Sequence, residues 1–136
     1  MERLIPAWVS RQIYPIDKTN IDILRFLHFL AIAWLIAAWG VWATLGDHPL
    51  VGETRGKGLV AALEIVEDKQ TNRRFPAQAN AGMTCREFCF NNGLVMRAVG
   101  DTMIISPPLV ITEEQVDELV KLARLSLDLT AAKLQE

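Results

Sequence analysis

The chain has 136 residues, with 14 Lys and Arg against 16 Asp and Glu, so its formal net charge is −2. This balance, without any basic run, argues against a general nucleic-acid binder, which needs a basic patch to neutralise phosphates. The length suits one ordinary domain, or a small domain with an appended segment. Hydrophobic residues make up 51% of the chain and are concentrated before residue 46.

Residues 1–25 form a mixed polar segment, and residues 26–46 contain no Asp, Glu, Lys or Arg. Roughly twenty helical residues cover the ~30 Å hydrocarbon core of a bilayer. A buried helix of a soluble core is the alternative, but so short a chain has little other surface to wrap a helix that is apolar on every side. We therefore expect residues 26–46 to span the lipid bilayer and to make this a single-pass membrane protein.

Two cysteines, Cys85 and Cys89, stand four residues apart in a segment with helical spacing, so they should share one helix face. No second pair of Cys or His supplies the other ligands of a metal site, so we expect buried free thiols and no bound metal.

A change in composition near residue 47 opens a different kind of segment. Residues 51–55 and 59–66 suit two short strands, and the intervening Gly56-Lys57-Gly58 suits a tight turn. A phosphate-binding loop would need a third glycine and a following helix, and neither is present. Residues 67–79 are polar and predict an exposed connection.

Residues 93–109 predict a hairpin around which this part of the chain is organised. A helix over residues 83–91 should precede it and end at Gly93. The dipeptide Gly100-Asp101 tolerates the positive φ angles of a two-residue turn. Alternation then places one set of side chains on a shared apolar face: Leu94, Met96, Ala98, Met103 and Ile105.

Arg97 lies on the opposite face of this predicted hairpin, beside Val99, Thr102 and Ile104. A guanidinium on a rigid strand can hold a carboxylate through two parallel hydrogen bonds. A surface arginine on a solvated face is the alternative interpretation.

The last predicted element is an amphipathic helix. Thr112 and Gln115 have the spacing of a capping box, with Ile111 and Val116 as a hydrophobic staple. The apolar stripe that follows has helical periodicity and should pack on the sheet: Val116, Leu119, Val120, Ala123 and Leu127.

The N-terminal part resembles the OpgC family of multi-pass membrane proteins, which are implicated in succinylating periplasmic glucans. The resemblance covers residues 4–40 and rests on the strings YPIDKTN at 14–20 and LRFLHFLA at 24–31. It implies no catalytic residue here. Because members of that family have many membrane helices, an acyl-transfer site could not be assembled from this chain alone.

Residues 47–130 are similar to the C-terminal small domain of class III aminotransferases, which depend on pyridoxal phosphate. The strings are HPLVGE at 48–53, RGKGL at 55–59, GLVMR at 93–97 and SPPL at 106–109. The resemblance implies an α+β domain in which a small antiparallel sheet has helices on one side. In ω-transaminase-like members, the arginine at the position of Arg97 approaches the substrate carboxylate, so the resemblance implies a substrate-binding role for Arg97.

The same resemblance implies that catalysis needs residues from elsewhere. In this family the Schiff-base lysine, the aspartate facing the pyridine nitrogen and the phosphate-binding groups lie in a large domain that precedes the small one. None of the motifs of that domain is matched here, so we expect no catalytic, cofactor-binding or metal residue in this chain. A separate large domain, or self-association, would be the expected partner.

We therefore expect three segments: a polar segment 1–25, a transmembrane helix 26–46 and an aminotransferase small domain 47–136. The favoured function is that of an aminotransferase fragment that retains the substrate arginine and is inactive alone. The alternatives are a membrane-anchored OpgC-like module and a fusion product without function.

Overall fold

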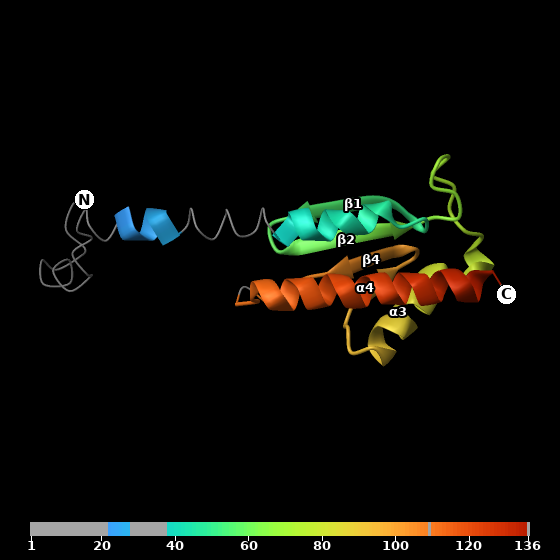
Figure 1. The fold of residues 1–136 in the computed structure, drawn as a ribbon. Helices are drawn as coiled ribbons and strands as arrows, with labels where there is room; N and C mark the ends of the chain where they lie inside the picture. The colour runs from blue at the N-terminus through green and yellow to red at the C-terminus, as the bar shows by residue number, and fades with distance from the viewer. Residues whose placement is uncertain (1–21, 28–37, 109, 136) are drawn as a thin grey trace, which may run out of the picture. The chain divides into compact units, whose positions relative to one another are not determined.

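The structure is a computed structural model that describes residues 22–27, 38–108 and 110–135 (Figure 1). It divides into two compact units, Met1–Trp34 and Leu35–Glu136. In the first unit, residues 22–27 are helical and their side chains are exposed. The second unit carries the sheet and the long helices.

The sheet of the second unit has four antiparallel strands in the order β1-β2-β4-β3. Their bounds are Val51–Lys57 for β1, Val60–Ile65 for β2, Arg97–Val99 for β3 and Thr102–Ile105 for β4. Each hairpin closes with a two-residue turn, because Lys57 pairs with Val60 and Val99 with Thr102. Gly58 and Gly100 have φ angles of +61° and +58° in these turns, which glycine adopts without steric cost.

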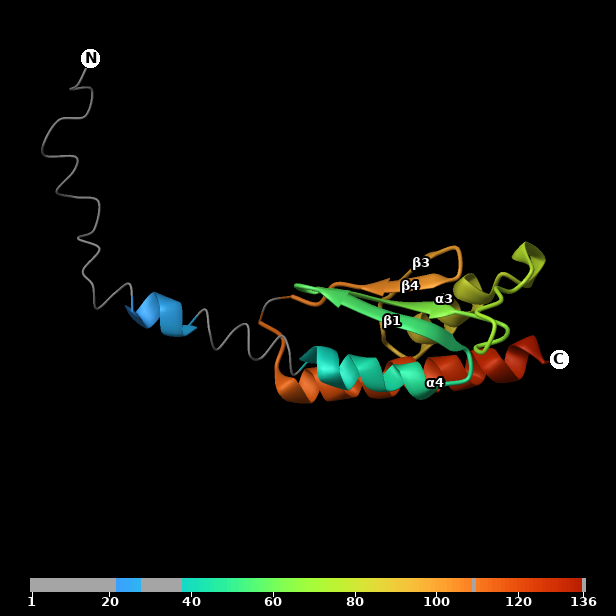
Figure 2. The ribbon, with the colours of Figure 1, turned by 90° about the horizontal axis from the view of Figure 1, so that it is seen from above.

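Three helical segments cover one face of this sheet. They are α3 (Ala81–Asn91), α4 (Glu113–Leu134) and a helix at residues 38–43 that continues into the short helix η1 (Thr44–Asp47). Figure 2 shows α4 and the helix at 38–43 running side by side on the same side of the sheet. The core lies between these helices and the inward side chains of the strands, and includes Leu63, Ile65, Met103, Ala123 and Leu127.

The hairpin and the last helix agree with the sequence-based predictions. Leu94, Met96, Met103 and Ile105 are all at most 7% exposed, whereas Arg97 and Val99 are exposed. The capping box of α4 is present, with Thr112 accepting from the Gln115 amide and Gln115 bonding back to the Thr112 amide. The predicted α+β arrangement, a small antiparallel sheet with helices on one side, is confirmed for this unit.

The predicted membrane-spanning helix, and with it the single-pass membrane localisation, is wrong. Within the part of the chain that the structure describes, no helix is both long and apolar enough to cross a membrane. Trp42 and Leu45 of the predicted span are 3% and 0% exposed, and they belong to the core of the α+β unit. Residues 28–37 of that span lie outside the described residues.

The physical reason is that hydropathy does not distinguish lipid from the inner face of a sheet. The Trp42 ring packs against the sheet, and its Nε1 donates to Ala62 O at 3.3 Å. Arg124 of α4 donates to Thr44 O at 2.7 Å. The apolar side chains at 39–45 are therefore used to complete a protein core.

The start of α3 packs directly against the turn of the β3–β4 hairpin. The Asp101 carboxylate accepts a hydrogen bond from the Gly82 amide at 3.1 Å, which satisfies a free N–H of the first helical turn. A Cβ at Gly82 would overlap Gly100 O and lie 3.1 Å from Asp101 Cα. The contact thus requires glycine.

We predict that Trp42→Ala will lower the free energy of unfolding by about 3–5 kcal/mol, because it removes a buried indole from the core. Trp42→Phe, which keeps most of the apolar volume but loses the bond to Ala62, should cost about 1 kcal/mol. Urea denaturation followed by far-UV circular dichroism measures both. A Trp42→Ala protein as stable as the wild type would contradict the placement of this side chain in the core.

We predict that Gly82→Ala will destabilise the fold by about 1–3 kcal/mol, because the added methyl group meets backbone that cannot move freely. Gly40→Ala is the matched control, since nothing lies within 4 Å of a Cβ at that helical position. It should be neutral or stabilising by up to ~1 kcal/mol through helix propensity. Equal effects of the two substitutions, measured by thermal unfolding, would refute the close contact at Gly82.

Candidate functional site

The sheet face opposite α3 and α4 carries the candidate site. Pairing across the four strands sets out two rows of side chains on this outer face: Arg55, Ala62, Ile104 and Arg97 in one row, and Glu53, Glu64, Thr102 and Val99 in the next. None of these side chains is fully buried. The first row therefore has an arginine at each end and apolar side chains between them, whereas the second row has glutamates on β1 and β2.

Arg97 lies at the β3 end of the first row, directly opposite Ile104 of β4. Its side chain is exposed, and it makes no ion pair or side-chain hydrogen bond with the described residues. The buried Met96 and the half-buried Ala98 hold the backbone on either side of it. The strand thus presents an unpaired guanidinium on a fixed base, which is a suitable donor for a carboxylate.

A second group of charges at the centre of this face was not predicted. Glu64 accepts hydrogen bonds from Arg55 Nη2 at 2.9 Å, Arg74 Nη2 at 3.4 Å and Thr102 Oγ1 at 3.4 Å. Burial by itself would raise the pKa of Glu64, but the hydrogen bond and charge of Arg55, with Arg74 and Thr102, outweigh it and lower the pKa. These bonds tie β1, β2, β4 and the loop after β2 together.

Whether the Arg55–Glu64 pair can be inferred from the sequence depends on where the β1–β2 turn is placed. With the predicted turn at residues 56–58, Arg55 would face Leu59, and Glu64 would not be among its neighbours. With the observed turn at Gly58-Leu59, Arg55 faces Ala62 and lies diagonal to Glu64. The position and length of the turn therefore decided whether the ion pair could be found.

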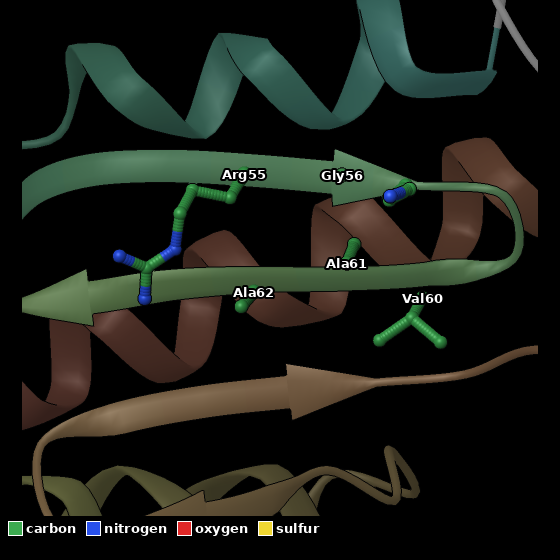
Figure 3. Close-up of a pocket in the computed structure, with 6 residues that line it drawn as sticks. Arg55, Gly56, Val60, Ala61 and Ala62 are labelled. Atoms are coloured by element: carbon green, nitrogen blue, oxygen red, sulfur yellow. The ribbon is translucent and has the colours of Figure 1, made fainter.

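A hollow of about 360 Å³ lies beside this group, at the tip of the β1–β2 hairpin. Figure 3 shows Arg55 reaching from β1 across β2, with α4 behind the strands. The lining of the hollow is apolar apart from two cationic side chains. It consists of Arg55, Gly56, Lys57, Val60, Ala61 and Ala62.

The two cysteines and the buried His48 make contacts within the fold. Cys85 and Cys89 are buried free thiols, as predicted, and their mutual hydrogen bond together with burial raises the pKa of Cys85. The buried His48 accepts from the Leu50 amide at Nδ1 and lies 3.1 Å from Asp128 through Nε2, so the neutral Nε2–H form fits both contacts. Among the described residues, no cluster of His, Cys, Asp and Glu could hold a metal ion.

The described residues do not fit a covalently bound aldehyde cofactor. A lysine that forms a Schiff base is desolvated in a pocket, which lowers the pKa of its amine. All four lysines in the described part of the chain, Lys57, Lys69, Lys121 and Lys133, are exposed. Lys69 donates to Gly46 O and, at 3.5 Å, to His48 O, which is a structural role.

Comparison with known proteins assigns the two parts of the chain to different relatives. Over 91 residues, 67% of the chain, it is 66% identical to the putrescine–pyruvate aminotransferase of Pseudomonas aeruginosa and covers 20% of that protein. The α+β unit also matches an ω-aminotransferase from Paracoccus denitrificans, with a TM-score of 0.72, 30% identity, and coverage of 76% of this chain and 23% of that one. A PLP-bound aminotransferase mutant from Vibrio fluvialis matches with a TM-score of 0.72, 26% identity, and coverage of 76% and 23%.

The class III aminotransferase resemblance of the C-terminal part is therefore confirmed as homology, and the chain spans about a fifth of the length of the curated relative. Residues 1–50 match the family described as OpgC protein. Since the second compact unit begins at Leu35, residues 35–50 belong both to the OpgC-like match and to the unit that resembles transaminases.

We predict that Glu64→Gln will lower stability by about 1 kcal/mol at pH 7 and by almost nothing once the pH is below the folded pKa of Glu64. The folded pKa of Glu64 is below its ordinary value of 4.5, so its charge stabilises the fold above that value and the stabilisation is lost as pH falls through the folded pKa. Urea unfolding at several pH values measures the difference.

Glu53→Gln is the control, because Glu53 also contacts Arg55, at 3.2 Å, but is 51% exposed. Its effect should be clearly smaller. A Glu64→Gln effect that did not depend on pH would rule out the ionised carboxylate as its source.

Proposed function

We propose that the C-terminal unit, residues 47–136, acts as the small domain of an aminotransferase and that Arg97 binds the carboxylate of an amino acid or keto acid substrate. The unpaired guanidinium on the outer face carries this proposal, supported by 66% identity to a putrescine–pyruvate aminotransferase. Pyruvate, named in that relative, is the first acceptor to test. The amine partner would be a diamine or an amino acid.

Arg97 would act by orienting the substrate. Its backbone is held by pairing with β4, while its side chain extends from the exposed face of the sheet. Two parallel N–H donors fix a planar carboxylate in position and in orientation. Without a carboxylate, the exposed side chain has room to turn into solvent, so an uncharged substrate could be accommodated.

The proposed reaction depends on pyridoxal phosphate, which serves as an electron sink in amino-group transfer. Because the exposed lysines described above do not fit that cofactor, we propose that it is held by a large domain on another polypeptide. The partner would be this large domain, or a further copy of the chain in a shared assembly. By itself the described unit should not catalyse transamination.

Complementation tests this proposal. The chain would be mixed with the large domain of the Pseudomonas aeruginosa enzyme, truncated before the segment that matches residue 47, and putrescine–pyruvate transamination measured. We expect activity from the mixture and none from either part alone. Arg97→Ala should lower kcat/KM for pyruvate by about 10- to 100-fold, the cost of losing charge-assisted hydrogen bonds.

Arg86→Ala is the matched control, because it removes the same charge from α3, where Arg86 stacks over Phe90 at 4.8 Å. It should leave the complemented rate unchanged. Equal losses in the two variants would refute the role of Arg97. A mixture that forms a complex but transfers no amino group would favour the alternative, a fusion product without aminotransferase function.

A further inference from the structure

The outer strand β1 has a free edge. Among the described residues, β1 pairs with β2 alone. It is seven residues long and carries no proline, so its unpaired backbone groups form a template for another strand.

The hydrogen bonds of β2 show which groups of β1 face this edge. The Ile65 amide donates to Asp101 O, in the turn of the β3–β4 hairpin, at 2.8 Å. The Val66 amide donates in the opposite direction, to Leu50 O just before β1, at 2.8 Å. Because successive strand residues alternate, Ala62 directs its backbone toward β1 and forms a hydrogen-bonded pair with Arg55. The backbones on either side of Arg55 must then face outward.

The residues on either side of Arg55 are Thr54 and Gly56. Their backbone N–H and C=O groups therefore point away from β2. No hydrogen bond from either backbone to another segment is present in the described part of the chain. Thr54 is half-buried and Gly56 is exposed. Donors and acceptors spaced two residues apart are what an added strand requires.

A groove of about 210 Å³ runs along this edge, between β1 and the helix at residues 38–43. Its lining comprises Trp39, Trp42 and Ala43 from the helix, and Thr54, Arg55 and Gly56 from the strand. The Trp39 ring lies against the backbone of Gly56, where a Cβ would be 2.9 Å from Cδ2. The indole therefore forms an apolar floor that side chains of an added strand could cover.

The other face of the edge carries one unpaired cation. Arg55 and Lys57, two residues apart, both project to the outer face; Arg55 is paired with Glu53 and Glu64, whereas Lys57 has no ion pair among the described residues. Arg55 and Lys57 both form hydrogen-bonded pairs with residues of β2. Opposite an added strand they would therefore occupy non-hydrogen-bonded positions, where cross-strand side chains lie closest together. A carboxylate of the added strand opposite Lys57 would find an unpaired cation there.

We propose that the free edge of β1 binds an extended peptide segment of a partner protein, whose alternate side chains are apolar over Trp39 and acidic beside Lys57. The peptide would extend the sheet by one strand. Its apolar residues would lie opposite Thr54 and Gly56 and exchange backbone hydrogen bonds with them.

The peptide acetyl-Thr-Val-Asp-Val-Asp-Val-Thr-amide is the probe, titrated into the full chain labelled with ¹⁵N. We expect amide exchange at Thr54 and Gly56 to slow by tenfold or more at saturation, and the Trp39 indole signal to shift. Unchanged exchange at both amides with millimolar peptide would overturn the proposal, as would slowing confined to other strands.

Two modified peptides test the register. N-methylation of the valines should abolish binding, because the valine amides face β1, whereas N-methylation of the aspartates should preserve it. Equal binding of the two peptides would overturn the proposed pairing.

Lys57→Glu tests the charge preference at a side chain that makes no ion pair with the described residues. It should weaken binding of the aspartate peptide by about three- to tenfold and strengthen that of a peptide with lysines in their place. An unchanged preference would refute the acidic character of the partner.

Discussion

The burial of one face of the antiparallel sheet is the constraint on which the rest of the structure depends. Leu63, Ile65 and Met103 are fully buried against the helices, and the period of two along a strand then commits their neighbours to the opposite face. Arg97 projects outward for this reason. Its guanidinium is available because the inward positions on either side of it are held by the core.

The same constraint explains why an apolar segment that reads as a membrane helix is part of this unit. The inner face of β1 and β2 must be covered, and Trp42 and Leu45 provide that cover together with α4. Residues 38–50, which lie within the OpgC match, are in this way part of a transaminase-like unit. A match to the OpgC family is thus compatible with packing in this unit.

The outer face and the strand edge serve different proposed purposes. On the outer face, Glu64 neutralises the cations near the centre of the sheet, and Arg97 stands apart from that network on the far strand. At the edge, the backbones of Thr54 and Gly56 lie above an aromatic floor. A substrate carboxylate at β3 and a partner peptide at β1 would therefore use opposite edges of the sheet, so the two proposals can fail independently.

The sequence by itself determined the elements whose signals are local. These are the Gly100-Asp101 turn, the alternation that exposes Arg97, and the capping box with the apolar stripe of α4. Only the tertiary structure decided what depends on contacts between distant residues. The Asp101 cap of α3, the Arg55–Glu64 pair and the burial of Trp42 join residues 19, 9 and 20 positions apart, and no local pattern specifies such partners. Apolar side chains gain free energy on leaving water for either lipid or a protein core, so only the packed sheet could distinguish the two environments.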